Sequence, residues 1–130
     1  VHALADAGYH VGFTHLGEDE RAQGLVSVLG GRGFAMEADA GDEGAVEAFH
    51  VQAAEWAGVA PQVLVNNAGI QTWAPLLDLA TEDWDRVIRT NLRGCFLNTR
   101  AAGRAMAAAG RLIGSRRPDL NRAARIVALM

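Results

Sequence analysis

A short apolar strand that stops at amide and small residues is the feature of this sequence best suited to chemistry. Residues 63–69 read Val-Leu-Val-Asn-Asn-Ala-Gly. A β-branched run of this kind is typical of a buried parallel strand, and α/β folds present ligand-binding loops at the carboxyl ends of such strands. Asn-Asn-Ala-Gly alone could be a turn, but directly after Val-Leu-Val it predicts a loop that faces a ligand.

A second amide, Asn91, lies within a helical pattern. The pattern predicts that this helix buries an apolar stripe made of Trp84, Val87, Ile88, Cys95 and Phe96. Asn91 is three or four residues from several members of this stripe. A buried amide costs about 1–3 kcal/mol unless it is hydrogen-bonded, so Asn91 must have partners. From the pattern alone, Asn91 either ties its helix to a neighbouring loop or takes part in catalysis.

Asp39 ends another predicted strand, and a second acid follows at Asp42. A carboxylate in this place either caps the next helix or faces a ligand. Because Asp42 already suits the capping position, Asp39 is the candidate for ligand binding.

In this order and spacing, these segments resemble the short-chain dehydrogenase/reductase family over essentially the whole chain. Asn91-Leu92-Arg93-Gly94 matches the family motif Asn-Leu/Val-x-Gly, whose asparagine is catalytic and holds a water in a proton relay from the active-site lysine. Residues 38–42, Ala-Asp-Ala-Gly-Asp, resemble the family's Ala-Asp-Val-Ser-Asp, whose acid hydrogen-bonds the adenine amino group. The resemblance thus makes Asn91 catalytic and Asp39 and Ala40 cofactor-binding residues.

By the same resemblance, Asn66, Ala68 and Gly69 approach the cofactor ribose through backbone groups, and Gly69 allows close approach because it lacks a Cβ. The cofactor is then NAD or NADP, and the substrate a small carbonyl or alcohol. An acid at the end of the strand at residues 9–14 would bind the ribose 2′-hydroxyl, whereas an arginine would accommodate a 2′-phosphate. This chain has neither, because Thr-His-Leu-Gly stands at residues 14–17, so the preference stays open.

Alternating strand and helix patterns predict an α/β fold with a parallel sheet. The resemblance implies that this is a partial doubly wound parallel sheet of the Rossmann type. We expect Thr81 to cap the long helix, Trp56 and Trp84 to be core residues, and Trp73 to line a substrate cleft or pack in the core. The family order 3-2-1-4-5 would place the last strand beside the strand at residues 63–65. The expected strands are 9–14, 34–38, 63–65 and 125–130, and the expected helices are 1–6, 18–29, 42–57 and 81–109.

Residues 1–130 are expected to form one incomplete NAD(P)-binding domain, an internal fragment truncated at both ends. The glycine-rich phosphate loop and first strand would precede Val1, and the catalytic Ser and Tyr-x-x-x-Lys would follow Met130. As written, the chain is expected to be inactive, with a gap at the centre of its sheet that leaves it poorly folded. The alternatives are a non-catalytic nucleotide-binding or regulatory protein of the same fold, and a decayed gene.

The amino-acid composition limits the chemistry and the partners that the chain can have. The chain has no lysine, which excludes lysine-dependent chemistry within it, and one cysteine, Cys95, which favours a reducing cytoplasm. Residues 1–65 carry ten acids and two arginines, whereas residues 66–130 carry five acids and ten arginines. We expect no nucleic-acid partner for the Arg-rich segment 111–125, no membrane span and no metal. The resemblance implies a homotetramer that uses the long helix as an interface, and residues 69–72 and 84–88 resemble the 3-oxoacyl-carrier-protein reductase and glucose 1-dehydrogenase branch.

Overall fold

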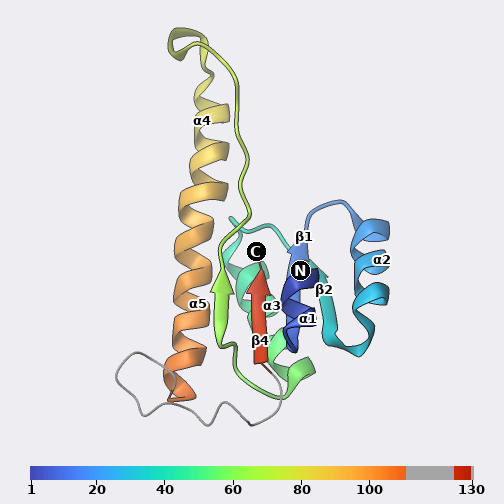
Figure 1. Ribbon diagram of the computed structural model, residues 1–130. Helices are drawn as coiled ribbons and strands as arrows, with labels where there is room; N and C mark the ends of the chain where they lie inside the picture. Colours follow the sequence, from blue (N-terminus) through green and yellow to red (C-terminus); the bar gives the residue numbers. More distant parts are fainter. Residues whose placement is uncertain (111–124, 130) are drawn as a thin grey trace.

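Four parallel strands form one sheet with the order β2-β1-β4-β3 (Figure 1). The computed structural model describes residues 1–110 and 125–129. Strands and helices alternate along the chain, as the sequence pattern predicts. The elements are α1 (His2–Asp6), β1 (Tyr9–His15), α2 (Asp19–Leu29), β2 (Gly33–Glu37), α3 (Glu43–Ala57), β3 (Val63–Val65), α4 (Thr81–Ile88), a π-helical turn (Arg89–Arg93), α5 (Gly94–Ala108) and β4 (Arg125–Leu129).

The position of β4 corrects one expectation. The family order would place this strand on the far side of β3 and leave a gap between β1 and β3. Instead β4 pairs with both strands, so that Val127 lies beside Val11 of β1 and beside Val63 of β3. Two facing strands without a partner between them would leave rows of N–H and C=O groups unsatisfied. The β-branched segment at residues 125–129 supplies those hydrogen bonds, so the described sheet is continuous.

Helices cover both faces of the sheet, and side chains alternate between them along β1. Val11 and Phe13 join a core under α1 and α2 with Ala5, Ala22 and Leu29.

On the opposite face, α3 and α5 cover the sheet, and Phe49, which has no exposed surface, is at the centre of that core. Gly12 lies beneath α3, where a Cβ would be 3.4 Å from the Cβ of Ala53. A glycine at this position lets α3 pack close to the sheet.

The N-terminus of α3 confirms one capping prediction, whereas the N-terminus of α4 shows another to be wrong. Asp42 is the N-cap of α3, and its Oδ1 accepts a hydrogen bond of 2.7 Å from the amide of Ala45. Thr81 is not a cap but the first residue of α4, whose N-cap position is Ala80 and carries no side-chain hydrogen bond. An alanine has no polar group for that purpose, so the acids Glu82 and Asp83 in the first turn complement the helix dipole instead.

The expected buried stripe on the long helix is also wrong. Trp84 and Phe96 are more than half exposed, and Cys95 is exposed as well. The upper part of the helix extends beyond the sheet, where the segment between β3 and α4 runs beside it and none of the described helices or strands covers it (Figure 1). Lower down, a close contact sets the rotation of the helix, because a Cβ on Gly94 would lie 3.0 Å from the carbonyl oxygen of Ala40. The buried face therefore follows Gly94 and continues through Leu97, Asn98 and Ala102.

The predicted Arg-rich connection falls mostly on residues 111–124, which lie outside the described residues. Within the described part of the chain, no helix is both long and apolar enough to cross a membrane.

Candidate functional site

A cleft of about 530 Å³ opens at the carboxyl ends of β1, β2 and β3. Each strand contributes the residues that follow it, and the long helix closes one side. Because parallel strands end at the same edge of a sheet, loops that are distant in sequence meet there. The lining residues are Thr14, His15, Leu16, Ala38, Asp39, Ala40, Asn67, Ala68, Gly69, Ile70, Arg86, Arg89 and Thr90.

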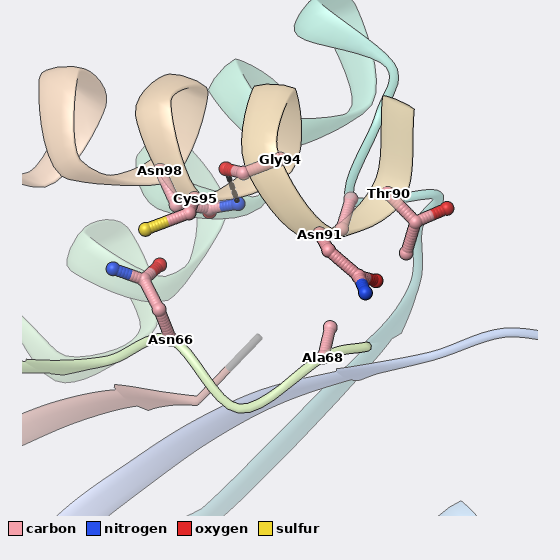
Figure 2. A pocket seen from close by; sticks show the side chains of 8 residues that line it. Asn66, Ala68, Thr90, Asn91, Gly94, Cys95 and Asn98 are labelled. Atoms are coloured by element: carbon pink, nitrogen blue, oxygen red, sulfur yellow. Dashed lines mark hydrogen bonds between the residues drawn. The ribbon is translucent and has the colours of Figure 1, made fainter. Parts of the chain in front are cut away.

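A smaller pocket adjoins this cleft and shares Ala40, Ala68 and Thr90 with it (Figure 2). It extends between the loop after β3 and the long helix, and Asn66 and Asn91 line it. All six residues singled out in the sequence therefore line one of two adjoining hollows. Four line the larger cleft, namely Asp39, Ala40, Ala68 and Gly69, and four line the smaller pocket, namely Ala40, Asn66, Ala68 and Asn91.

Asn91 lies in the π-helical turn and directs its amide at the loop after β3. Its Oδ1 accepts a hydrogen bond of 2.9 Å from the amide of Ile70, and its Nδ2 donates one of 2.8 Å to the carbonyl of the same residue. These two hydrogen bonds tie the helix to the loop, which is one of the two alternatives that the sequence pattern left open for Asn91. Asn91 is exposed rather than buried, contrary to expectation, but both of its polar groups have partners. A π-helical turn is rare and is often found at functional sites.

The tie holds Gly69 beside the amide of Asn91. A Cβ built on Gly69 would lie 3.5 Å from Oδ1 of Asn91, an ordinary contact distance. The packing within the protein therefore does not require glycine at this position.

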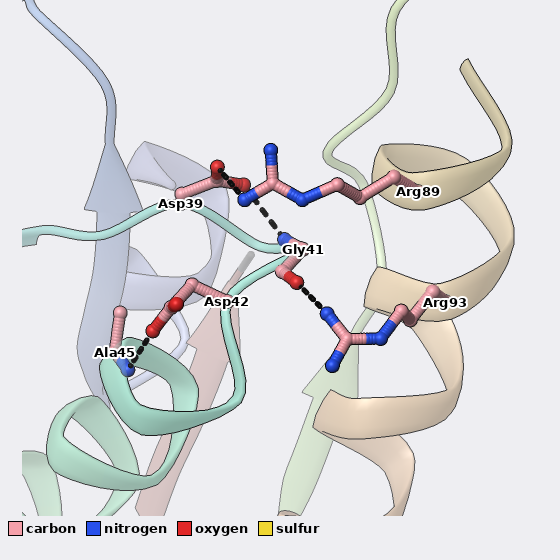
Figure 3. A network of polar contacts seen from close by, with 6 residues as sticks. All are labelled: Asp39, Gly41, Asp42, Ala45, Arg89 and Arg93. Carbon is pink, nitrogen blue, oxygen red and sulfur yellow. Dashed lines mark hydrogen bonds and ion pairs between the residues drawn. The ribbon is translucent and has the colours of Figure 1, made fainter. Parts of the chain in front are cut away.

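Asp39 lies in the turn after β2, and both of its carboxylate oxygens are engaged (Figure 3). Oδ1 accepts a hydrogen bond of 2.7 Å from the amide of Gly41, and Oδ2 accepts one of 2.6 Å from Nη2 of Arg89. The side chain keeps 31 % of its surface exposed and lines the larger cleft. Each carboxylate oxygen has a second lone pair, so Asp39 can still accept a hydrogen bond from a ligand.

Arg86, the other arginine that lines the cleft, also has a partner. Nη2 of Arg86 lies 2.8 Å from the carboxylate of Asp83. The His15 side chain is largely buried, and its Nδ1 lies 3.5 Å from the carboxylate of Asp19 without a hydrogen bond. Trp73 is 87 % exposed, which excludes the core-packing alternative.

A buried polar pair lies next to the smaller pocket. Nε2 of His50 on α3 is 3.2 Å from Oδ1 of Asn98 on α5, and Nδ2 of Asn98 donates a hydrogen bond of 3.0 Å to the carbonyl of Gly94. Since Oδ1 of Asn98 can only accept, Nε2 of His50 carries the hydrogen. Burial lowers the pKa of His50, and the hydrogen bond with Asn98 offsets part of that shift.

Sequence reasoning missed Arg89, Thr90 and Asn98 as site residues. Arg89 could have been predicted to contact an acid, because an acidic first half and an Arg-rich second half of the chain favour ion pairs between the two halves. Thr90 could have been included because it precedes Asn91 and lines both hollows. Nothing in the helical pattern distinguishes Asn98 from a solvent-facing amide.

Comparison with known proteins adds to this geometry. The sequence matches, over residues 1–116, the family model described as enoyl-(acyl carrier protein) reductase. The chain belongs to the short-chain dehydrogenase/reductase family of oxidoreductases. It is 36 % identical over 96 residues to 3-oxoacyl-(acyl-carrier-protein) reductase FabG of Staphylococcus aureus, covering 72 % of this chain and 39 % of that protein. It is 39 % identical over 97 residues to D-threitol dehydrogenase of Mycolicibacterium smegmatis, covering 70 % of this chain and 36 % of the relative.

Solved structures of the short-chain dehydrogenase/reductase family are also similar. A short-chain dehydrogenase/reductase from Serratia marcescens superposes with a TM-score of 0.74 at 34 % identity, covering 78 % of this chain and 42 % of that one. A short-chain dehydrogenase from Burkholderia cenocepacia, solved in complex with NADP, superposes with a TM-score of 0.74 at 31 % identity, covering 80 % and 43 %. The chain thus spans less than half the length of these relatives.

No three His, Cys, Asp or Glu side chains among residues 1–110 and 125–129 form a group that could hold a metal ion.

Proposed function

We propose that this chain is the cofactor-binding part of an NAD(P)-dependent oxidoreductase that acts on a small carbonyl or alcohol. The observation that carries the proposal is the gathering of Asp39, Ala40, Asn66, Ala68, Gly69 and Asn91 around two adjoining hollows at the carboxyl ends of parallel strands. These residues come from three separate segments, and a dinucleotide site at this edge is the general rule for such sheets.

The cleft suits the adenosine half of a dinucleotide. The adenine amino group donates hydrogen bonds. Asp39 has a fixed carboxylate that can still accept one, so we assign Asp39 to the adenine base. Ala40 and Ala68 offer small side chains between the two hollows, which leaves room for flat rings and sugars. Asn66 and Gly69 are assigned to the ribose side, through backbone groups. The nicotinamide, when bound, supplies the hydride chemistry.

Asn91 is proposed as the catalytic amide of this site. Its ties to Ile70 use one lone pair of Oδ1 and one N–H of Nδ2. An amide has two of each, so one acceptor and one donor remain for a water in a proton relay. The acid–base residues of such a relay, a tyrosine and a lysine, are not supplied here. The sequence has no lysine, and Tyr9, its only tyrosine, is followed four residues later by Phe13 and not by lysine. We expect residues 1–130 alone to be inactive.

The substrate is proposed to be a 3-oxoacyl group or a sugar-like polyol, because the relatives named above act on compounds of both kinds. NAD and NADP both remain candidates for the cofactor. We further propose that the protein is cytoplasmic and that it assembles as a homotetramer through its long helix. Trp84, Leu92 and Phe96 on that helix are exposed, and exposed large apolar side chains often mark subunit contacts, which supports such an interface.

Sequencing the coding DNA on both sides of this segment tests the proposal. An in-frame glycine-rich loop upstream and a Ser followed by Tyr-x-x-x-Lys downstream would support it, and the whole protein would then be assayed with NADH and NADPH. A reading frame without that tyrosine and lysine would contradict the oxidoreductase proposal and leave a non-catalytic nucleotide-binding protein. The size of the whole protein in solution tests the tetramer, and a monomer would contradict it.

A further inference from the structure

The π-helical turn Arg89–Arg93 contacts two loops that enter the cleft. On one side Asn91 is hydrogen-bonded to Ile70, in the loop after β3. On the other side Arg89 pairs with Asp39, and Nη1 of Arg93 donates to the carbonyl of Gly41, in the loop after β2 (Figure 3). One turn of helix thus holds both segments to which the cofactor roles are assigned.

The packing around this turn is close on the side of the β2 loop. A Cβ on Gly41 would come within 2.8 Å of Cγ of Arg89, and one on Gly94 within 3.0 Å of the carbonyl oxygen of Ala40. Two glycines therefore let the loop and the helix touch through their backbones. Further along, Arg100 pairs with Glu43 at the start of α3, so the loop is anchored beyond the cleft as well.

The pair of Asp39 and Arg89 is too exposed to be explained as a stabilising contact. The Asp39 side chain is 31 % exposed and the Arg89 side chain 51 %, and ion pairs at such exposure contribute little to the free energy of unfolding. The pair does restrict geometry, because Oδ1 of Asp39 is held by Gly41 and Oδ2 by Arg89. With both oxygens held, the carboxylate cannot rotate, and its free lone pairs keep one direction relative to the cleft.

We propose that Arg89 is a positioning residue that orients the Asp39 carboxylate for recognition of the adenine amino group. This inference rests on the proposed function, since it needs a dinucleotide in the cleft. Arg89 acts through Asp39, and a planar guanidinium suits this task better than an ammonium because its donors have a fixed geometry.

The test compares two probes that differ at the base. NAD carries the 6-amino group of adenine, whereas nicotinamide hypoxanthine dinucleotide carries a carbonyl oxygen there, which cannot donate to Asp39. The dissociation constants of both are measured by calorimetry for the wild-type chain and for Arg89→Met. We expect the wild type to prefer NAD and Arg89→Met to lose about two- to tenfold of that preference, the range of one net hydrogen bond.

Several variants separate positioning from a general structural role. Asp39→Asn should lose the same preference, and adding Arg89→Met to it should cause no further loss, because both act on one contact. Arg89→Lys, which retains the charge, should fall between the wild type and Arg89→Met. Arg21→Met removes a surface ion pair with Glu18 on α2 and should leave the ratio unchanged.

The outcomes distinguish this inference from the proposed function. If the wild type binds NAD but Arg89→Met and Arg89→Lys weaken both probes equally or neither, the positioning role is wrong and the site stands. An equal loss of preference in Arg21→Met would likewise overturn it. Both probes are also used as their 2′-phosphates, because the cofactor is NAD or NADP. If the wild type binds neither form of either probe, the proposed function and this inference both fail.

Discussion

The contact between Asn91 and Ile70 leads to the most direct prediction about the site's architecture. Replacing Asn91 with alanine removes two hydrogen bonds, of 2.8 and 2.9 Å, and creates no clash. Each neutral hydrogen bond contributes about 0.5–1.5 kcal/mol net, so the pair contributes at most about 3 kcal/mol. Because the loop is exposed, water can replace the lost partners, and we expect a loss near the middle of that range, about 1–2 kcal/mol.

The measurement follows both the whole molecule and the loop. Urea unfolding reports the free energy of unfolding, and hydrogen exchange at the amide of Ile70 reports local opening. A loss of about 1.4 kcal/mol would speed exchange at this amide about tenfold. Val28→Ala is the control, because Val28 on α2 is 71 % exposed and lies outside the long helix and both hollows. It should change the free energy of unfolding by no more than about 0.5 kcal/mol.

A second substitution at Asn91 tests the direction of the hydrogen bonds. Asn91→Asp keeps the shape but replaces the donor that faces the Ile70 carbonyl with an oxygen. At neutral pH the carboxylate should repel that carbonyl and destabilise the loop at least as much as alanine does. If Asn91→Ala leaves both the unfolding free energy and the Ile70 exchange rate unchanged, the tie does not hold the loop and the reasoning is wrong.

The remaining predictions concern the core and the β2 loop. Burial lowers the pKa of His50, so the unfolded chain binds the proton more readily than the folded one. The free energy of unfolding should therefore fall as the pH drops below about 6.5. Urea unfolding of His50→Gln across that pH range should show a smaller fall. Gly41→Ala should lower the unfolding free energy by about 1–2 kcal/mol, because its Cβ would meet Arg89 at 2.8 Å, whereas Gly44→Ala, in the first turn of α3 with ordinary contacts, should raise it by up to about 1 kcal/mol. Phe49→Ala should cost about 3–5 kcal/mol in urea unfolding, since Phe49 is fully buried.

Local patterns were sufficient to predict most of the elements, whereas the set of site residues came from the resemblance to the family. The alternation of strands and helices, the cap at Asp42 and the loop after residues 63–65 each depend on neighbours in sequence. Once parallel strands are accepted, topology brings Asp39 and Asn66 to one edge, whereas the place of Asn91 beside them depends on the packing of the long helix.

What the sequence did not predict depends on distant partners. The place of β4 is decided by two unpaired edges, on β1 and β3, that no local pattern records. The rotation of the long helix follows from the contact of Gly94 with Ala40, whereas the apolar pattern favoured the larger side chains that turned out to be exposed. The pair of Asp39 and Arg89 joins residues 50 positions apart, and a π-helical turn has no signature in hydrophobic periodicity.

The central claim is that the cleft at the carboxyl ends of the strands binds a nicotinamide dinucleotide. Titrating the chain with NADH and NADPH, followed by the fluorescence of the reduced nicotinamide, tests it most directly. We predict saturable binding of at least one of them, weakened at least about tenfold by Ala68→Leu, which would fill the space between the two hollows, and unchanged by Ala3→Leu on the exposed face of α1. Absence of saturable binding, or equal binding by Ala68→Leu, would contradict the account.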